Sequence, residues 1–216
     1  MLAYIDQGEI TMKRLFAITI GLLAVAVTLA GCNTRPPIQA DSSNWITLFD
    51  GSETSLDKNW TRVGDANWRI YRGAVMADHK NGKAGSFLLS KNSYKDFQLN
   101  IEFWASNDAN SGIYMRCADP KKLADTSCYE ANVYDQRPDP SYGTGAIVHI
   151  ATVHPMPKAG GKWNTYEITV QGKRISVWLN GELTVDVEDG KLSSGPIALR
   201  YGAGVVKFRK VQVRQL

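Results

Sequence analysis

Residues 110–116, Asn-Ser-Gly-Ile-Tyr-Met-Arg, and residues 129–135, Tyr-Glu-Ala-Asn-Val-Tyr-Asp, both alternate in side-chain character from one residue to the next. Successive side chains of a β-strand point to opposite faces of a sheet, so this period predicts two strands. Tyr114 and Arg116 then share one face, and Glu130 lies on the corresponding face of the second strand. A guanidinium, a carboxylate and a phenol can bind sugar hydroxyls or move protons. The two stretches therefore predict a functional site built on a sheet.

The same alternation continues in both directions along the chain, through residues 97–104, 166–171 and 175–180. Gly172 and the pair Asn180-Gly181 lie between such stretches, where tight hairpin turns need residues that tolerate positive φ. Beyond the N-terminal segment, no helical periodicity lasts more than about two turns. Many short strands separated by turn signals predict an all-β protein, and we favour a two-sheet antiparallel sandwich over a barrel.

The last predicted strand contains one irregularity. Val206 and Phe208 have one parity, whereas Val211 and Val213 have the other. A β-bulge near residues 209–210 returns both pairs to the core.

The N-terminus reads as a bacterial lipoprotein signal. A basic start at residues 12–14 precedes an apolar run at residues 15–30, which is too short to span a bilayer comfortably. Leu29-Ala30-Gly31-Cys32 resembles a lipobox, in which the cysteine is lipidated and becomes the mature N-terminus. We expect residues 1–31 to be the signal peptide, with 1–11 arising from a misassigned start codon. A retained signal anchor is the alternative.

The rest of the chain divides into a short tether and one domain. Residues 32–44 form the predicted lipidated tether, and residues 45–216 are enough for a single domain with a substantial core. Asn33 after the cysteine favours the outer membrane, so we expect a lipid-anchored protein of the bacterial envelope that faces the periplasm. The formal net charge of +4 is scattered without a basic stripe, and we expect no nucleic-acid partner.

Two cysteines remain once Cys32 carries lipid. Cys117 and Cys128 flank a polar loop of about ten residues between the two site strands, in an oxidising compartment. A disulfide between them adds about 2–3 kcal/mol and fixes how the strands present their side chains. Two free buried thiols are the alternative.

Several short motifs, taken together and in order, resemble one family. They are Leu48-Phe49-Asp50-Gly51, Trp68 with Gly73, residues 110–116, residues 129–135, Thr144-Gly145-Ala146, Trp163-Asn164-Thr165-Tyr166, Trp178-Leu179-Asn180-Gly181, Gly195-Pro196-Ile197 and Phe208-Arg209. The set resembles the 3-keto-disaccharide hydrolase domain family over about residues 45–216. The resemblance implies a jelly-roll sandwich of the concanavalin-A-like lectin and glucanase type. The cysteine pair and the two histidines in residues 148–155 depart from the family pattern and leave the substrate open.

The resemblance implies cleavage of glycosides whose sugar carries a ketone at C3. The ketone acidifies the hydrogen at C2, so the aglycone leaves C1 by elimination and water then adds. This route needs a general base and a group that stabilises the enolate oxygen. We expect Glu130 as the base, with His149 or His154 as rivals, and Arg116 at the enolate.

The substrate is expected to be a carbohydrate held on the same face. The residues that we expect to bind it are Asn110, Tyr114, Asn132, Asp135, Trp104 and Trp178. Direct glycoside hydrolysis needs two carboxylates close together. The same-face neighbour of Glu130 is Asn132, an amide and not an acid, so this mechanism is disfavoured.

Alternatives remain open at this point. Arg116 and Glu130 can also be interpreted as a cross-strand ion pair, His149 as a structural or surface histidine, and the tryptophans as sheet packing. No cofactor is predicted, although a divalent metal bound by histidines and Asp108, Asp119 or Asp125 stays possible. A non-catalytic carbohydrate-binding lipoprotein is the alternative function, followed by an envelope interaction protein without a sugar ligand. The oligomeric state is not predicted.

Overall fold

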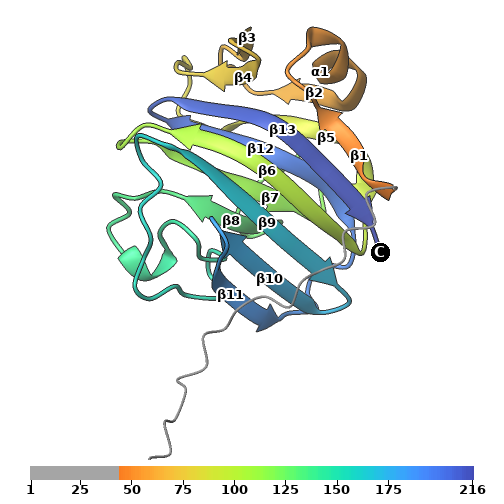
Figure 1. Cartoon of the computed structure of the whole chain (residues 1–216), viewed down its shortest axis with the longest axis vertical. Helices are drawn as coiled ribbons and strands as arrows, with labels where there is room; N and C mark the ends of the chain where they lie inside the picture. The colour runs from red at the N-terminus through yellow and green to blue at the C-terminus, as the bar shows by residue number, and fades with distance from the viewer. Residues whose placement is uncertain (1–43) are drawn as a thin grey trace, which may run out of the picture. The chain divides into compact units, whose positions relative to one another are not determined.

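The computed structural model describes residues 44–216, which form a two-layer antiparallel β-sandwich (Figure 1). The predicted signal peptide, the lipidation site at Cys32 and all but the last residue of the tether lie outside the described residues. None of the described residues forms a helix long and apolar enough to cross a membrane.

The large sheet has the strand order β11-β10-β9-β6-β13-β4-β3, with β1 beside β13. Its strands are β1 (Ile46–Phe49), β3 (Arg69–Tyr71), β4 (Ala74–Ala77), β6 (Phe97–Ala105), β9 (Trp163–Gln171), β10 (Arg174–Leu179), β11 (Glu182–Glu188) and β13 (Val206–Gln215). Five of these strands, from β13 to β11, lie side by side at the front of Figure 1.

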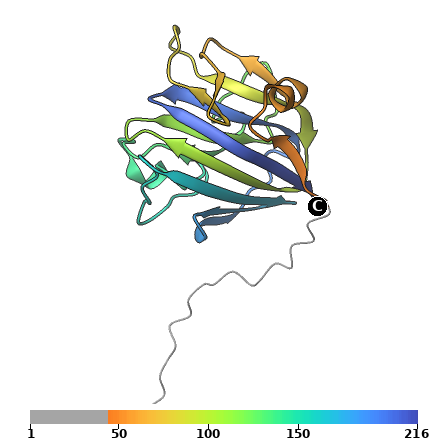
Figure 2. The ribbon, with the colours of Figure 1, turned by 45° about the horizontal axis from the view of Figure 1, so that its top comes forward.

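The small sheet lies behind the large one in the order β2-β5-β12-β7-β8. Its strands are β2 (Trp60–Val63), β5 (Ser86–Tyr94), β7 (Asn110–Met115), β8 (Tyr129–Val133) and β12 (Gly195–Ala203). The helix α1 (Glu53–Asn59) and the β3–β4 hairpin lie at one end of the sandwich in Figures 1 and 2. A 3-10 turn, η2 (Pro140–Tyr142), belongs to the long connection between β8 and β9. The prediction of an all-β jelly-roll sandwich is confirmed.

The inner faces of the two sheets enclose one core. In β6 the buried side chains are Phe97, Leu99, Ile101 and Phe103, and the residues between them are only half-buried. The same alternation fills the core from β9, β10 and β13, whereas β12 is buried on both faces over residues 195–199. Alternation with period two therefore sets which face of these strands turns to the core.

The predicted irregularities also occur. The register of β13 against β6 shifts between Arg209 and Val211, and Lys210 has φ 50°, so the bulge at residues 209–210 is confirmed. Asn180 and Gly181 have φ 53° and 84°, which is the geometry that joins β10 to β11 by a tight turn.

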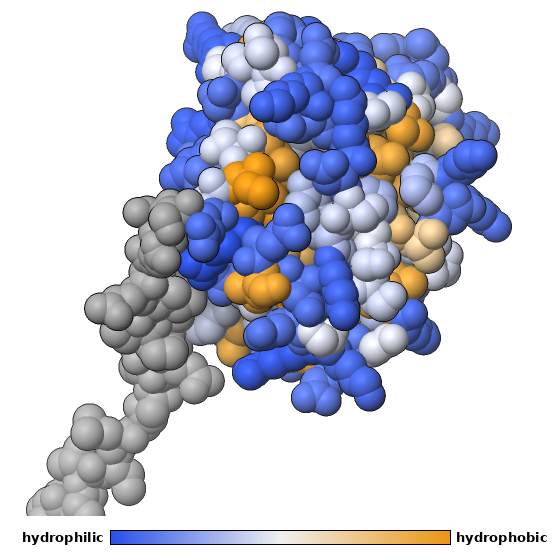
Figure 3. Space-filling view, turned by 90° about the vertical axis from the view of Figure 1, so that its right-hand side faces the viewer, coloured by the Kyte–Doolittle hydropathy of each residue, from blue (hydrophilic) through white to orange (hydrophobic). Residues whose placement is uncertain are grey.

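The outer surface has no large continuous apolar area on the side shown in Figure 3, where hydrophobic patches are small and separate. The large apolar side chains that are at least 38% exposed are Ile46, Tyr71, Trp163, Leu183 and Leu216. Four of these belong to strands of the large sheet, namely Ile46 of β1, Tyr71 of β3, Trp163 of β9 and Leu183 of β11.

Candidate functional site

β7 and β8 place a polar group on the outer face of the small sheet. Tyr114 lies directly opposite Glu130 in the antiparallel register, while Ile113 and Ala131 face the core. Gly112 lies one position along the same outer face, and a Cβ atom there would stand 2.5 Å from Oε1 of Glu130. The carboxylate therefore lies over the glycine, in space that any other residue at position 112 would fill.

The Glu130 carboxylate is buried and incompletely satisfied. Its side chain is 4% exposed, and Oε1 has no hydrogen-bond partner. Burial raises the pKa of Glu130 to about 7, although the charge of Arg200 and a hydrogen bond with Tyr114 oppose the shift. Buried carboxylate oxygens normally have partners, so an unpartnered one indicates a place for a ligand donor. A carboxylate with this pKa is suited to exchange protons near neutral pH.

Arg200 of β12 is the basic residue of this face, and it is not among the site residues predicted from the sequence. Its Nη1 lies 3.7 Å from Oε1 of Glu130 and also donates a hydrogen bond to Oδ1 of Asn110. Arg200 lies opposite Gly112 in the β12–β7 register, and its side chain is 19% exposed. The alternation of β12, with Ile197, Leu199 and Tyr201 in the core, was the signal that would have placed Arg200 on the outer face.

Tyr114 completes the group. Burial is the main cause that raises the pKa of the Tyr114 phenol above its ordinary value, and the charge of Glu130 acts in the same direction. The hydroxyl is therefore protonated at neutral pH. The ring packs against Phe87, with 5.2 Å between ring centroids. The predicted proximity of Asn110, Tyr114 and Glu130 is thus realised in the structure, with Arg200 in the position expected for Arg116.

The expectation that Arg116 faces Glu130 is wrong. β7 ends at Met115, and Arg116 has φ 49°, so the alternation of the strand stops before it. Its guanidinium is 1% exposed and pairs with Asp96 at 2.9 Å. It also donates hydrogen bonds to the backbone carbonyls of Lys95, Gly172 and Leu192. These bonds join Arg116 to three connections between strands, so its guanidinium is not available to a substrate on the outer face.

Asn132 and Asp135 have structural partners. The amide of Asn132 donates to the carbonyl of Tyr142 at 2.7 Å, and the residue is 1% exposed. The Asp135 carboxylate accepts from the hydroxyl of Thr144 and from the backbone N–H groups of Ala159 and Gly160. These contacts hold the long β8–β9 connection against β8, so neither side chain is free for the predicted role in substrate binding.

His149 lies beside the site in an exposed turn. Its backbone has φ 62°, and Nε2 lies 3.2 Å from Oδ2 of Asp125 in the loop between the cysteines. The turn is docked on β8, because Val148 donates a backbone hydrogen bond to Glu130. A pocket of about 180 Å³ opens between Asp125, His149 and Lys191. The charge of Asp125 also contributes to the raised pKa of Glu130. His154 is exposed.

Trp104 and Trp178 belong to the other side of the sandwich. They lie on β6 and β10, where their neighbours Phe103, Val177 and Leu179 face the core. Both tryptophans therefore point away from the core on the large sheet, and the expectation that they share a face with Glu130 is wrong.

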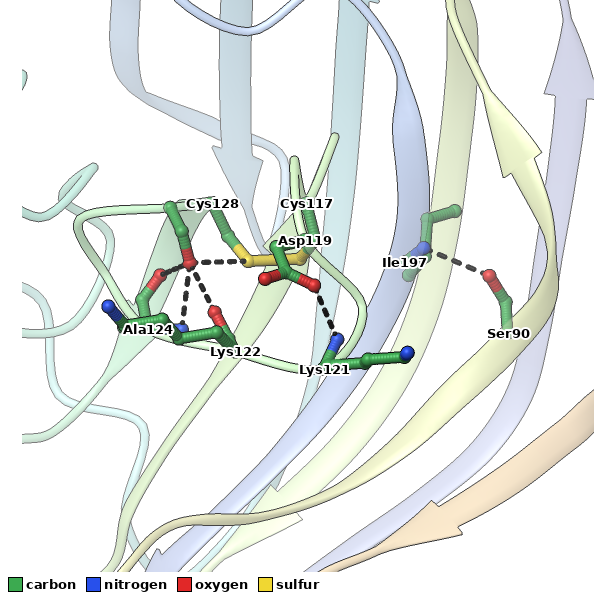
Figure 4. Close-up of a disulfide and its surroundings, with 9 residues drawn as sticks. Ser90, Cys117, Asp119, Lys121, Lys122, Ala124, Cys128 and Ile197 are labelled. Carbon is green, nitrogen blue, oxygen red and sulfur yellow. Dashed lines mark hydrogen bonds between the residues drawn. A yellow bond between two sulfur atoms is a disulfide. The ribbon is translucent and has the colours of Figure 1, made fainter.

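The predicted disulfide between Cys117 and Cys128 is present (Figure 4). The loop that it closes is held internally by Ser127, whose hydroxyl donates to the carbonyl of Lys122 and accepts from the backbone N–H of Ala124. Both cysteines pack with Phe87, Tyr114 and Ala198 in a small apolar cluster outside the main core. The loop therefore covers part of the outer face next to the site.

Within residues 44–216, no three His, Cys, Asp or Glu side chains converge as a metal site would require. The potential metal ligand Asp125 is paired with a single histidine, His149.

Comparison with known proteins gives a family match over nearly the whole described region. The model of the 3-keto-alpha-glucoside-1,2-lyase-like domain matches residues 44–214. No curated protein sequence matches this chain significantly.

Solved structures share the sandwich. A proposed glycosyl hydrolase from Parabacteroides distasonis ATCC 8503 superposes with a TM-score of 0.69 at 16% identity, over 81% of this chain and 95% of that chain. The carbohydrate binding module CBM66 from Bacillus subtilis has a TM-score of 0.57 at 21% identity, over 73% and 96%. The Bacillus licheniformis β-glucanase has a TM-score of 0.54 at 12% identity, over 73% and 92%. At these identities the likeness establishes the fold.

Proposed function

Because the chain belongs to the family of 3-keto-alpha-glucoside-1,2-lyase-like domains, we propose that it cleaves the glycosidic bond of 3-keto-glycosides on the outer face of its small sheet. The observation that carries the proposal is the buried Glu130 carboxylate, whose unpartnered Oε1 lies 3.7 Å from the Arg200 guanidinium. A base and a cation held this close match what an elimination next to a ketone requires.

In the proposed reaction, the Glu130 carboxylate removes the proton from C2 of the sugar. The electron pair of that C–H bond forms an enolate, whose oxygen at C3 is stabilised by Arg200. When the C3 carbonyl re-forms, the electrons make a C1–C2 double bond and expel the aglycone oxygen from C1. That oxygen takes back the proton held by Glu130. Addition of water across the double bond then yields the free 3-keto sugar.

Each site residue has its own role in this series of reaction steps. The pKa of Glu130, at about 7, matches a group that accepts and returns one proton near neutral pH. Arg200 stays cationic and donates N–H groups without losing a proton. Its hydrogen bond to Asn110 holds it beside Glu130. Tyr114, which is protonated and lies directly opposite Glu130 in the strand register, supplies a hydroxyl next to the carboxylate.

The test is release of 4-nitrophenol from 4-nitrophenyl 3-keto-glucoside, with unoxidised 4-nitrophenyl glucoside as the substrate control. We expect turnover of the ketone only, because only the ketone acidifies C2. Glu130→Gln and Arg200→Ala should each lower kcat/KM by about 10²-fold or more, whereas Glu102→Gln on the large sheet should not. Exchange of the C2 hydrogen in D₂O should be lost with Glu130→Gln.

Two results would contradict the proposal. Full activity of Glu130→Gln on a verified substrate would exclude this face as the active site. Sugar-dependent thermal stabilisation without turnover of any keto-glycoside would instead favour a non-catalytic carbohydrate-binding protein.

A further inference from the structure

The large sheet carries an unusual set of aromatic and basic side chains on its outer face, on the opposite side of the sandwich from Glu130. Five cation–π pairs occur among the described residues, and all involve this sheet or its flanking residues. The concentration of these pairs on one face of the sandwich is a feature that the proposed reaction does not use.

The side chains form a row across the strands. Trp163 of β9 lies opposite Trp104 of β6, and Trp104 lies opposite Lys207 of β13. Tyr71 of β3 extends the row, because the Lys207 ammonium lies 4.4 Å from the centre of the Trp104 ring and 5.7 Å from that of Tyr71. We call Tyr71, Trp104, Trp163 and Lys207 the aromatic row. Neighbouring strands are about 4.8 Å apart, so the row runs across several strand spacings.

Cations lie next to the rings of the aromatic row. Arg209 lies 4.0 Å from the centre of the Trp163 ring, and Arg72 lies 5.2 Å from that of Tyr71. Glu102 pairs with Arg209 at 2.7 Å and with Lys210 at 3.7 Å. Within residues 44–216, neither Lys207 nor Arg72 has a carboxylate oxygen within 4.0 Å. Within the described residues, Lys207 and Arg72 are therefore cations at the aromatic row that form no ion pair.

We propose that the aromatic row and its cations bind an acidic polysaccharide chain, as a second carbohydrate site separate from the proposed reaction. Tyr71 and Trp163 are 42% and 38% exposed, which leaves ring surface for the apolar faces of sugar rings. Lys207 and Arg72 offer N–H groups to sugar carboxylates, and the rings beneath them stabilise their charge. An extended chain with a charge on each sugar can contact the rings and the cations of this row at the same time, which a single small ligand cannot do.

The test is affinity electrophoresis of the full chain in non-ionic detergent, in gels that contain polygalacturonate or neutral dextran. We expect retardation by polygalacturonate alone, which weakens as NaCl rises from about 50 to about 300 mM. Trp163→Ala and Lys207→Gln should each weaken binding by about five- to tenfold. Trp178→Ala on the same sheet and Lys58→Gln on α1 are the matched controls and should bind like wild type.

The outcomes separate this proposal from the proposed reaction. Glu130→Gln should bind polygalacturonate like wild type, so a failure of catalysis leaves the test intact. Equal binding of all variants, or equal retardation by dextran, would overturn the proposal. Stronger, row-dependent binding to phosphatidylglycerol vesicles than to polygalacturonate would overturn it in favour of a membrane surface.

Discussion

At the scale of single residues, burial has two effects on Glu130: it gives the carboxyl a pKa suited to proton transfer, and it makes the ionised carboxylate destabilise the fold. The same removal from water that raises its pKa to about 7 makes its ionised form unfavourable in the folded protein. Arg200 and Tyr114 offset only part of that cost, since Oε1 remains without a hydrogen-bond partner. If Glu130 serves function at the expense of stability, replacing it should raise the free energy of unfolding.

The pH dependence of stability should show this cost. Below about pH 4.5 the carboxyl is protonated in both the folded and the unfolded states, so it imposes no penalty. As the pH rises from 4.5 to about 7, the unfolded state loses the proton first and is favoured, and above that range the penalty is complete. Relative to wild type, Glu130→Gln should therefore gain stability between about pH 4 and about pH 8, by up to about 3 kcal/mol. Urea unfolding at both pH values measures the gain. Identical pH profiles for the two proteins would show that ionisation of Glu130 does not destabilise the folded protein.

Arg116 represents the opposite case, a charged residue that supports the fold. Its guanidinium has four acceptors from three connections, and one of them is the ion-paired carboxylate of Asp96. Arg116→Ala removes the donor from three backbone carbonyls and the charge partner from Asp96, and should lower the free energy of unfolding by about 3 kcal/mol or more. Arg174→Ala, which breaks an exposed pair with Asp186, should cost less than about 1 kcal/mol.

Turnover distinguishes a structural from a catalytic arginine. Per folded molecule, Arg116→Ala should keep its activity on a 3-keto-glycoside, whereas Arg200→Ala should lose it. If Arg116→Ala instead unfolded like wild type and lost turnover, the assignment of the two arginines would be reversed.

At the scale of elements, the β7–β8 pair and its connecting loop form one unit. The strands hold Tyr114 and Glu130 in register, and the Cys117–Cys128 disulfide closes the loop between them. Asp125 in that loop contacts His149 in the turn that docks on the backbone of Glu130. The site is therefore bordered by two connections that are both anchored to β8.

The disulfide should order the loop and stabilise the domain. Mass spectrometry of the unreduced protein should identify a linked peptide that contains Cys117 and Cys128. Replacing both with serine should lower stability by about 2–3 kcal/mol and speed hydrogen exchange of residues 118–127 more than that of β7. Alkylation of both thiols without reductant would contradict the first expectation, and uniform exchange changes would contradict the second.

At the scale of the whole molecule, the sandwich presents two separate outer faces. The small sheet carries the buried acid and its arginine, and the large sheet carries the aromatic row. A single core holds both faces, so each can be altered by surface substitutions without disturbing the other.

The proposed anchoring concerns residues outside the described part of the chain. If Cys32 carries lipid, acyl chains hold the protein on a membrane without a spanning helix. Cys32→Ser should then move the protein from the detergent phase to the aqueous phase in a Triton X-114 separation, because the acyl chains are lost. Unchanged partitioning of the variant would show that the N-terminal segment itself is a retained anchor, and cell fractionation would then test the proposed outer-membrane location.

The sequence by itself determined the sheet, the face that each strand buries, the hairpin at residues 180–181 and the bulge at residues 209–210. These follow from local rules, since alternation has a fixed period and positive φ favours few residues. The sequence also predicted the face on which Glu130 lies, because β7 and β8 are adjacent along the chain. It predicted the Cys117–Cys128 pair because the two cysteines flank one loop.

Only the tertiary structure decided which arginine meets Glu130. Arg200 is 70 residues further along the chain, and it reaches the site because β12 pairs with β7. Arg116 does not belong to the site because β7 ends one residue before it. Trp104 and Trp178 do not belong to it because β6 and β10 are strands of the other sheet. Parity along one strand fixes the face within a sheet, but it carries no information on which sheet a strand joins or on its distant neighbours. Those depend on packing between segments that are remote in sequence.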